Sequence, residues 1–107
     1  MRNHLEIPVK KILELYTYNE WTGDFTRKSD GHVPGYWWKN KYIRVVVDDT
    51  SYPAHRCAWA ICYYDPGDLV VDHINQHRGD NSIENLQAIT KGENSALAVA
   101  RTQTYLR

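Results

Sequence analysis

The sequence has no long hydrophobic run. Its longest uninterrupted apolar stretch, Cys57–Tyr64, is eight residues long, whereas a helix that spans a bilayer needs about 20. The first residues, MRNHLEIPVKK, contain neither the apolar core nor the small-residue cleavage site of a signal peptide. These absences predict an intracellular, cytoplasmic protein that has no membrane partner.

Cysteine is also scarce. Cys57 and Cys62 are too few for a disulfide framework and cannot by themselves form a four-ligand zinc site. Their spacing is not the C-x-x-C of a redox motif. We therefore expect two thiols in an apolar segment and no structural zinc.

The chain lacks an excess of either charge. Its 13 Lys and Arg side chains balance 13 Asp and Glu side chains, so any binding to nucleic acid has to depend on local charge. The run Tyr36–Val47 carries Lys39, Lys41 and Arg44 without an acidic residue. These three cations fit the backbone of DNA, and they fit the solvated face of a hairpin equally well.

A length of 107 residues predicts a single domain over residues 1–107. We expect an α+β fold in which residues 1–51 form an N-terminal helix and β-hairpins. Residues 52–107 then supply a buried helix, two short strands around a polar loop, and a final helix. The predicted segments are a helix over Ile7–Leu15, a turn at Glu20–Gly23, a strand over Lys41–Val47, a turn at Asp48–Ser51, a helix over His55–Tyr63, strands over Leu69–Ile74 and Leu86–Ile89, and a helix from Lys91 to about Thr102.

The start of the final helix is well marked. Thr90 and Glu93 form the T-x-x-E pattern of a capping box, in which each side chain accepts a hydrogen bond from the other residue's backbone N–H. This start places Asn94 in the first turns of the helix, close to the end of the preceding strand.

Three side chains in this half suit hydrolytic chemistry. Asp72 offers a carboxylate oxygen and Asn94 an amide oxygen, the donors that Mg²⁺ prefers. His73 can accept a proton near neutral pH. A hard cation beside a general base is suited to the attack of water on a phosphodiester.

Each of these residues also has a purely structural interpretation. An Asp-His pair at a strand end is often a turn cap, and Asn85 suits a loop-closing role. Asn94 suits an exposed position on a helix. Taken singly, each of these structural interpretations is the better one, and only the combined spacing favours a site.

That spacing resembles the HNH nucleases of the ββα-metal class, of the phage and intron-homing type. The similar text is YPAHRCAWAI, VVDHINQHRGDNSIENLQAIT and KGENSA, in which Asn85 follows His73 by twelve positions and Asn94 follows Asn85 by nine. The resemblance covers Tyr52–Ala96 and extends loosely to the N-terminal strands. It implies a C-terminal ββα-metal motif, activity on DNA and a phage or prophage origin.

The resemblance also implies a role for each residue. His73 would be the general base, Asp72 and Asn94 would hold one Mg²⁺ or Mn²⁺, and Asn85 would fix the loop so that His73 faces the phosphate. Arg56 would contact a DNA phosphate. Cleavage of double-stranded DNA would leave a 5′-phosphate and a 3′-hydroxyl.

One geometric condition has to be met. Neighbouring residues on a regular strand point to opposite faces, so Asp72 and His73 serve one site only where the strand ends. Among the other histidines, we expect His55 to be structural and His77 to be solvated in its loop.

Two further function classes remain open. The chain fits a catalytically silent DNA-binding protein that keeps the HNH fold, and it also fits a small metal-binding structural module. For a nuclease with one metal and one base, each subunit nicks one strand, so a double-strand break requires a homodimer or two encounters. The sequence shows no helix-turn-helix or other separate DNA-recognition module, so we expect low specificity for the DNA target.

Overall fold

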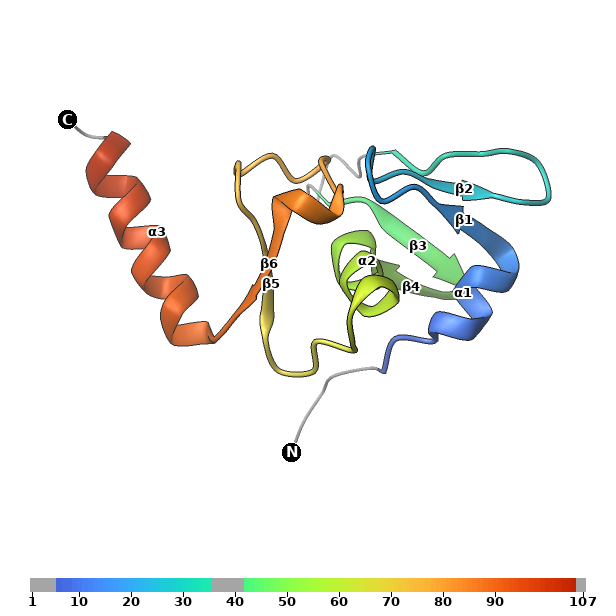
Figure 1. The fold of residues 1–107 in the computed structure, drawn as a ribbon, viewed down its shortest axis with the longest axis horizontal. Helices are drawn as coiled ribbons and strands as arrows, with labels where there is room; N and C mark the ends of the chain where they lie inside the picture. Colours follow the sequence, from blue (N-terminus) through green and yellow to red (C-terminus); the bar gives the residue numbers. More distant parts are fainter. Residues whose placement is uncertain (1–5, 36–41, 106–107) are drawn as a thin grey trace.

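The computed structural model describes residues 6–35 and 42–105, with the backbone alone for residues 103–105. Small antiparallel sheets and helices alternate along the chain, which gives the predicted α+β class (Figure 1). The elements, in order, are α1 Val9–Leu15, β1 Tyr16–Tyr18, β2 Phe25–Arg27, β3 Arg44–Val47, β4 Thr50–Pro53, α2 Ala54–Cys62, β5 Val70–His73, η1 Ile83–Asn85 (a 3₁₀ turn), β6 Leu86–Ile89 and α3 Lys91–Tyr105.

Helix α2 lies at the centre of the fold and carries much of the core. Its residues Ala54, Cys57 and Ala58 are fully buried, and their i, i+3, i+4 spacing places them on one face of the helix. They pack with Ile12 of α1 and Val45 of β3 in a single apolar cluster. The small side chains of α2 allow the surrounding hairpins to approach it closely.

Two hairpins precede this helix. Strand β1 pairs with β2 in antiparallel register, Tyr16 opposite Arg27, and β3 pairs with β4, Val47 opposite Thr50. The sequence predicted a turn over Asp48–Ser51, but Thr50 already belongs to β4. The turn is therefore tighter than predicted.

The tight turn requires a left-handed backbone at both of its central residues. Asp48 has a φ of 49° and Asp49 a φ of 64°, as in the two-residue turns that match the twist of paired strands. Aspartate tolerates this conformation better than most residues other than glycine. The helix α1 likewise begins at Val9 rather than at Ile7, since Pro8 precedes it with a non-helical ψ of 72°; the N–H of Ile7 donates to Asp65 Oδ2 at 2.8 Å.

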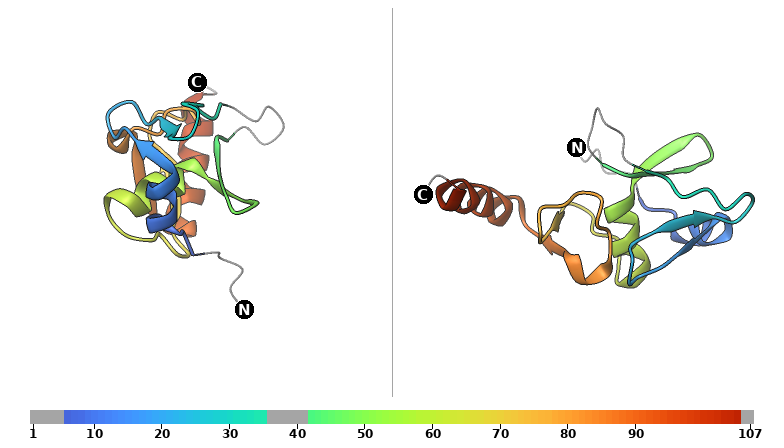
Figure 2. Two further views of the ribbon diagram at one scale, coloured as in Figure 1. Left: turned by 90° about the vertical axis from the view of Figure 1, so that its right-hand side faces the viewer. Right: turned by 90° about the horizontal axis from the view of Figure 1, so that it is seen from above.

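The C-terminal half forms a third hairpin followed by a helix. Strands β5 and β6 pair antiparallel, with His73 opposite Leu86. Helix α3 then extends away from the central helix and lies beside β5 (Figures 1 and 2). Within the described ranges, no helix combines the length and the apolar character that crossing a membrane requires.

Candidate active site

A pocket between the β5–β6 hairpin and α3 gathers the predicted chemical groups. Asp72, His73 and Asn94 all line it, together with Arg101 from the same face of α3. Strand β5 ends at His73, which meets the geometric condition that the sequence set. The complete lining consists of Tyr42, Val70, Val71, Asp72, His73, Gln76, Arg78, Asn94, Ala98, Arg101 and Thr102.

The Asp72 carboxylate is held by two neighbours. The Arg101 guanidinium donates to both oxygens, at 3.1 Å to Oδ1 and 3.0 Å to Oδ2, and Gln87 Nε2 donates to Oδ2 at 2.9 Å. Burial raises the pKa of Asp72, but the hydrogen bonds from Arg101 and Gln87 outweigh it, so the net pKa lies below its ordinary value. Asp72 is therefore ionised at neutral pH and available as an anionic ligand.

The His73 imidazole is buried in a cluster of rings. Only 5% of the residue is exposed, and its ring centroid lies 4.9 Å from that of His55 and 6.3 Å from that of Tyr42. Burial lowers the pKa of His73, although the hydrogen bond to Asn81 and the charge of Asp72 oppose the shift. The ring is thus neutral near pH 7, the protonation state that a general base needs.

Asn85 ties the two ends of the loop between β5 and β6. Its Oδ1 accepts from the Asn75 backbone N–H at 2.9 Å, and its Nδ2 donates to Asn75 Oδ1 at 2.9 Å and to the Asp80 carbonyl at 2.8 Å. The residue is buried, and its side chain is not part of the pocket lining. This geometry fits a bracing role for Asn85.

The predicted DNA contacts lie at different places. Arg56 donates to the carbonyls of Leu69 and Gly67 at 2.8 and 2.6 Å, so these hydrogen bonds join α2 to the turn before β5. Arg44 is hydrogen-bonded across the β3–β4 hairpin to Ser51. Lys39 and Lys41 lie outside the described residues. The DNA-binding roles of these four residues stay predictions.

The two remaining histidines of this half are separated by the fold. His55, at the start of α2, is largely buried and stacks on Tyr42 at 5.1 Å. Burial, with smaller contributions from His73 and nearby arginines, lowers the pKa of His55 to about 3. His77 is exposed in the loop and does not line the pocket.

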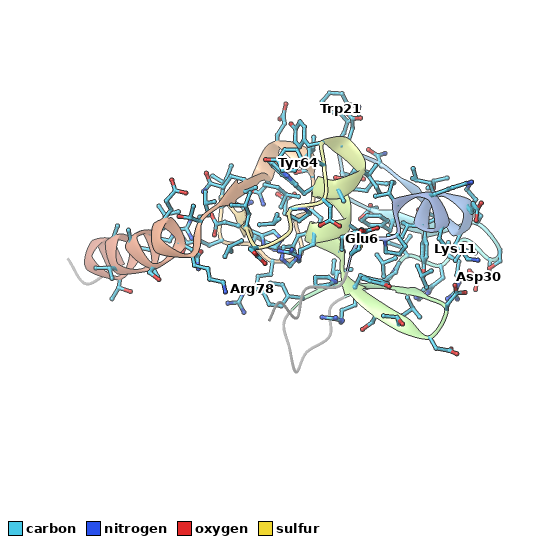
Figure 3. The ribbon with its side chains drawn as sticks, turned by 90° about the horizontal axis from the view of Figure 1, so that it is seen from below. Glu6, Lys11, Trp21, Asp30, Tyr64 and Arg78 are labelled. Atoms are coloured by element: carbon cyan, nitrogen blue, oxygen red, sulfur yellow. The ribbon has the colours of Figure 1, made fainter. Side chains whose placement is uncertain are left out.

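The sequence interpretation missed three residues of this region. Asn81 is 1% exposed and its Oδ1 lies 2.8 Å from His73 Nε2. Arg78 places its guanidinium 5.0 Å from the Tyr42 ring centre at the edge of the pocket. Figure 3 shows Arg78 on the side of the molecule opposite Trp21. Arg101 follows Asn94 by two helical turns, and this spacing is the sequence signal that could have placed it on the same face.

The donor set fits a hard divalent cation. Mg²⁺ is commonly held by one or two protein oxygens, with water and phosphate completing its shell, and Asp72 with Asn94 supplies a carboxylate and an amide oxygen. The described part of the chain has no group of three or more His, Cys, Asp or Glu side chains placed to hold a metal ion. A metal at Asp72 has to share the carboxylate with Arg101 or displace it.

Comparison with known proteins shows what the segment around this pocket is similar to. Residues 52–96 match the family model described as HNH endonuclease, and this segment contains Asp72, His73, Asn85 and Asn94. The resemblance noted in the sequence is therefore confirmed for residues 52–96, which are similar to the HNH endonucleases.

A solved structure supports the same class over more of the chain. The chain is similar to the HNH homing endonuclease I-HmuI, with a TM-score of 0.63 and 25% sequence identity. The solved structure of I-HmuI describes DNA binding and cleavage by that enzyme. The match covers 81% of this chain and 53% of that one, so the present chain spans about half the length of its structural relative. No curated protein matches the chain.

Proposed function

We propose that the chain is a divalent-metal-dependent endonuclease acting on double-stranded DNA, folded as one domain over residues 1–107 with its HNH core in residues 52–107. The observation that supports this proposal most strongly is the shared pocket. A carboxylate, a neutral imidazole and an amide, from Asp72, His73 and Asn94, line one open site within the segment that matches the family. The relative I-HmuI is described as binding and cleaving DNA.

In the proposed reaction, His73 accepts a proton from a water molecule. The water oxygen forms a bond to phosphorus and the P–O3′ bond breaks, so the products carry a 5′-phosphate and a 3′-hydroxyl. Asp72 and Asn94 would hold Mg²⁺ or Mn²⁺, which when bound neutralises charge on the phosphate and on the leaving oxygen. Asn85 keeps the loop closed behind His73.

DNA binding in this proposal depends on a few cations around the pocket. Arg78 lies at its edge, and Arg44, Arg56, Lys39 and Lys41 are further candidates. A site with one base and one metal nicks one strand, so a double-strand break requires a homodimer or two encounters.

One observation favours the alternative of a silent DNA-binding protein that keeps the HNH fold. The Arg101 guanidinium already neutralises the proposed metal ligand Asp72 with two hydrogen bonds. A protein that never binds metal would be stable in this arrangement. Nicking of supercoiled plasmid, with Mg²⁺ or Mn²⁺ and with chelator, separates the two functions. DNA binding without metal-dependent nicking would establish the silent alternative.

The general base is tested by His73→Ala. Loss of a general base costs about 10²–10⁴-fold in rate, so we expect nicking to fall by that factor while DNA binding and the melting temperature change little. His77→Ala, in the same loop region but outside the pocket, is the matched control and should nick at the wild-type rate. An unchanged rate for His73→Ala would refute the assignment.

A further inference from the structure

The N-terminal hairpin contacts the loop that lies against His73. This hairpin, β1–β2 with its turn, belongs to residues 16–27, which precede the segment matching the HNH family. Tyr18 Oη donates to the carbonyl of Asn81 at 2.6 Å, and the N–H of Ile83 donates to the carbonyl of Glu20 at 2.9 Å. Two hydrogen bonds therefore join the hairpin to the backbone just before β6.

Gly23 brings the two backbones into close contact. Its φ is +83°, and a Cβ at this position would overlap the carbonyl carbon of Asn81 and the amide nitrogen of Ser82. Only glycine fits both the turn and the approach. The hairpin thus fixes the position of the Asn81 backbone from one side.

From this backbone the Asn81 side chain reaches His73. An amide oxygen accepts hydrogen bonds and cannot donate them, so the 2.8 Å contact between Asn81 Oδ1 and His73 Nε2 requires the proton on Nε2. In a neutral ring the lone pair then lies on Nδ1. Among the described residues, no other hydrogen bond involves the His73 side chain.

We propose that Asn81 is the positioning residue of the general base, and that the N-terminal hairpin acts through it. Asn81 selects the imidazole tautomer and the ring orientation that leave Nδ1 free to accept the proton of water. Tyr18, Gly23 and Glu20 hold Asn81 in place. This inference rests on the proposed nuclease function for its catalytic meaning, but the ring geometry can be measured without any catalysis.

The first experiment compares variants of Asn81 in the full chain. Asn81→Leu removes the acceptor while keeping a similar volume, and Asn81→Asp keeps an acceptor oxygen at the same place. We measure ¹⁵N NMR shifts of the His73 ring nitrogens, which distinguish a protonated from an unprotonated nitrogen, together with kcat and KM for plasmid nicking. We expect Asn81→Leu to lose the single Nε2–H tautomer and to lower kcat about 10- to 100-fold at nearly unchanged KM, since small misplacements of catalytic groups have effects of this size. Asn81→Asp should restore the Nε2–H signal.

The second experiment tests the hairpin, with a matched control for each change. Tyr18→Phe removes the hydroxyl that donates to Asn81, and Tyr16→Phe removes a hydroxyl of the same hairpin that donates to Val46 instead. Gly23→Ala forces the hairpin away from Asn81, whereas Gly31→Ala introduces the same strain at a φ of +74° with open space around the new Cβ. Tyr18→Phe and Gly23→Ala should shift the His73 ring signals and lower kcat, and both controls should leave them unchanged.

The outcomes separate this inference from the proposed function. If the wild-type chain nicks DNA but Asn81→Leu has wild-type ring signals and kcat, the role of Asn81 is refuted while the nuclease function stands. If ring signals and kcat respond to Asn81 but not to Tyr18→Phe or Gly23→Ala, the role of the hairpin is refuted. If the wild-type chain does not nick, the function fails, and the ring signals alone decide whether Asn81 orients His73.

Discussion

Asp72, which the sequence predicted to be a metal ligand, forms an ion pair with Arg101 within the pocket. The carboxylate side chain is 10% exposed and the guanidinium 27% exposed, so water screens their attraction only in part. A divalent cation and Arg101 both favour the same two oxygens. At the scale of single residues, the metal affinity of the proposed site would therefore depend on Arg101, a side chain that holds no metal itself.

Replacement of Arg101 should strengthen metal binding. In Arg101→Gln the Asp72 carboxylate loses its competing cation, so the Mn²⁺ or Mg²⁺ concentration at half-saturation should fall several-fold. Isothermal titration calorimetry measures this without reference to cleavage. Arg27→Gln is the control, because it breaks an exposed two-bond pair with Asp30 away from the pocket. Weaker metal binding in Arg101→Gln would show that Arg101 supports the metal site rather than competing with it.

Replacement of Asn85 should lower the stability of the fold. Asn85→Ala removes the three hydrogen bonds that this buried side chain makes to the loop, and leaves the Asn75 N–H and the Asp80 carbonyl without this partner. Unsatisfied buried groups cost about 1–3 kcal/mol, so the free energy of unfolding should fall by roughly that amount. Thermal melting measures it. Asn94→Ala, whose side chain lines the pocket, should alter metal binding at nearly unchanged melting temperature. Equal melting for Asn85→Ala and wild type would contradict the bracing role.

At the scale of elements, the start of α3 both stabilises the helix and positions Asn94 at the pocket. The predicted capping box is present: the Thr90 N–H donates to Glu93 Oε1 at 2.8 Å, and the Glu93 N–H donates to Thr90 Oγ1 at 3.1 Å. The first turn of α3 places Asn94 at the pocket, and the same helix face continues to Arg101. The cap thus fixes Asn94, the proposed amide ligand, relative to β5.

Loss of the cap should therefore affect both helix and metal. Thr90→Val keeps the shape of the side chain but removes the hydroxyl acceptor, at a cost of about 0.5–2 kcal/mol. We expect lower helicity by circular dichroism and weaker metal binding by calorimetry. Ser95→Ala, at an exposed position of the same helix, should change neither. Unchanged metal affinity in Thr90→Val would show that Asn94 does not depend on the cap.

At the scale of the whole molecule, burial of neutral histidine makes stability depend on pH. His55 lies in the first turn of α2; the charges of His73, Arg56 and Arg44 lower its pKa, and the charge of Asp72 raises it. Burial is the largest cause, and the pKa of His55 is about 3 in the folded chain. The unfolded chain binds the proton near the ordinary value of about 6.5.

The sign of the effect follows from this difference. Below the unfolded pKa the unfolded state binds more protons, so the free energy of unfolding should fall on acidification from pH 7 to 5, by up to about 1.4 kcal/mol per pH unit. Urea denaturation across this range measures the slope. His55→Phe should flatten it, with a remainder from His73, whereas the exposed His32→Phe should not. A wild-type slope in His55→Phe would contradict the assignment.

The sequence by itself predicted the elements of the C-terminal half and the candidate groups of the proposed site. The spacing of Asp72, His73, Asn85 and Asn94 indicated the family resemblance. Local patterns predicted the strands, the capping box and the central helix. These features are local in the chain, because apolar periodicity, turn chemistry and caps act over a few residues.

Contacts between distant segments were decided only by the tertiary structure. Strand β4 was missed because Thr50 and Ser51 suit a turn, and only its pairing with β3 makes it a strand. The hydrogen bonds of Arg101 to Asp72 and of Asn81 to His73, and the bracing of Asn81 by Tyr18, join residues 29, 8 and 63 positions apart. No local pattern encodes such contacts, because they exist only once segments far apart in the chain are folded against one another.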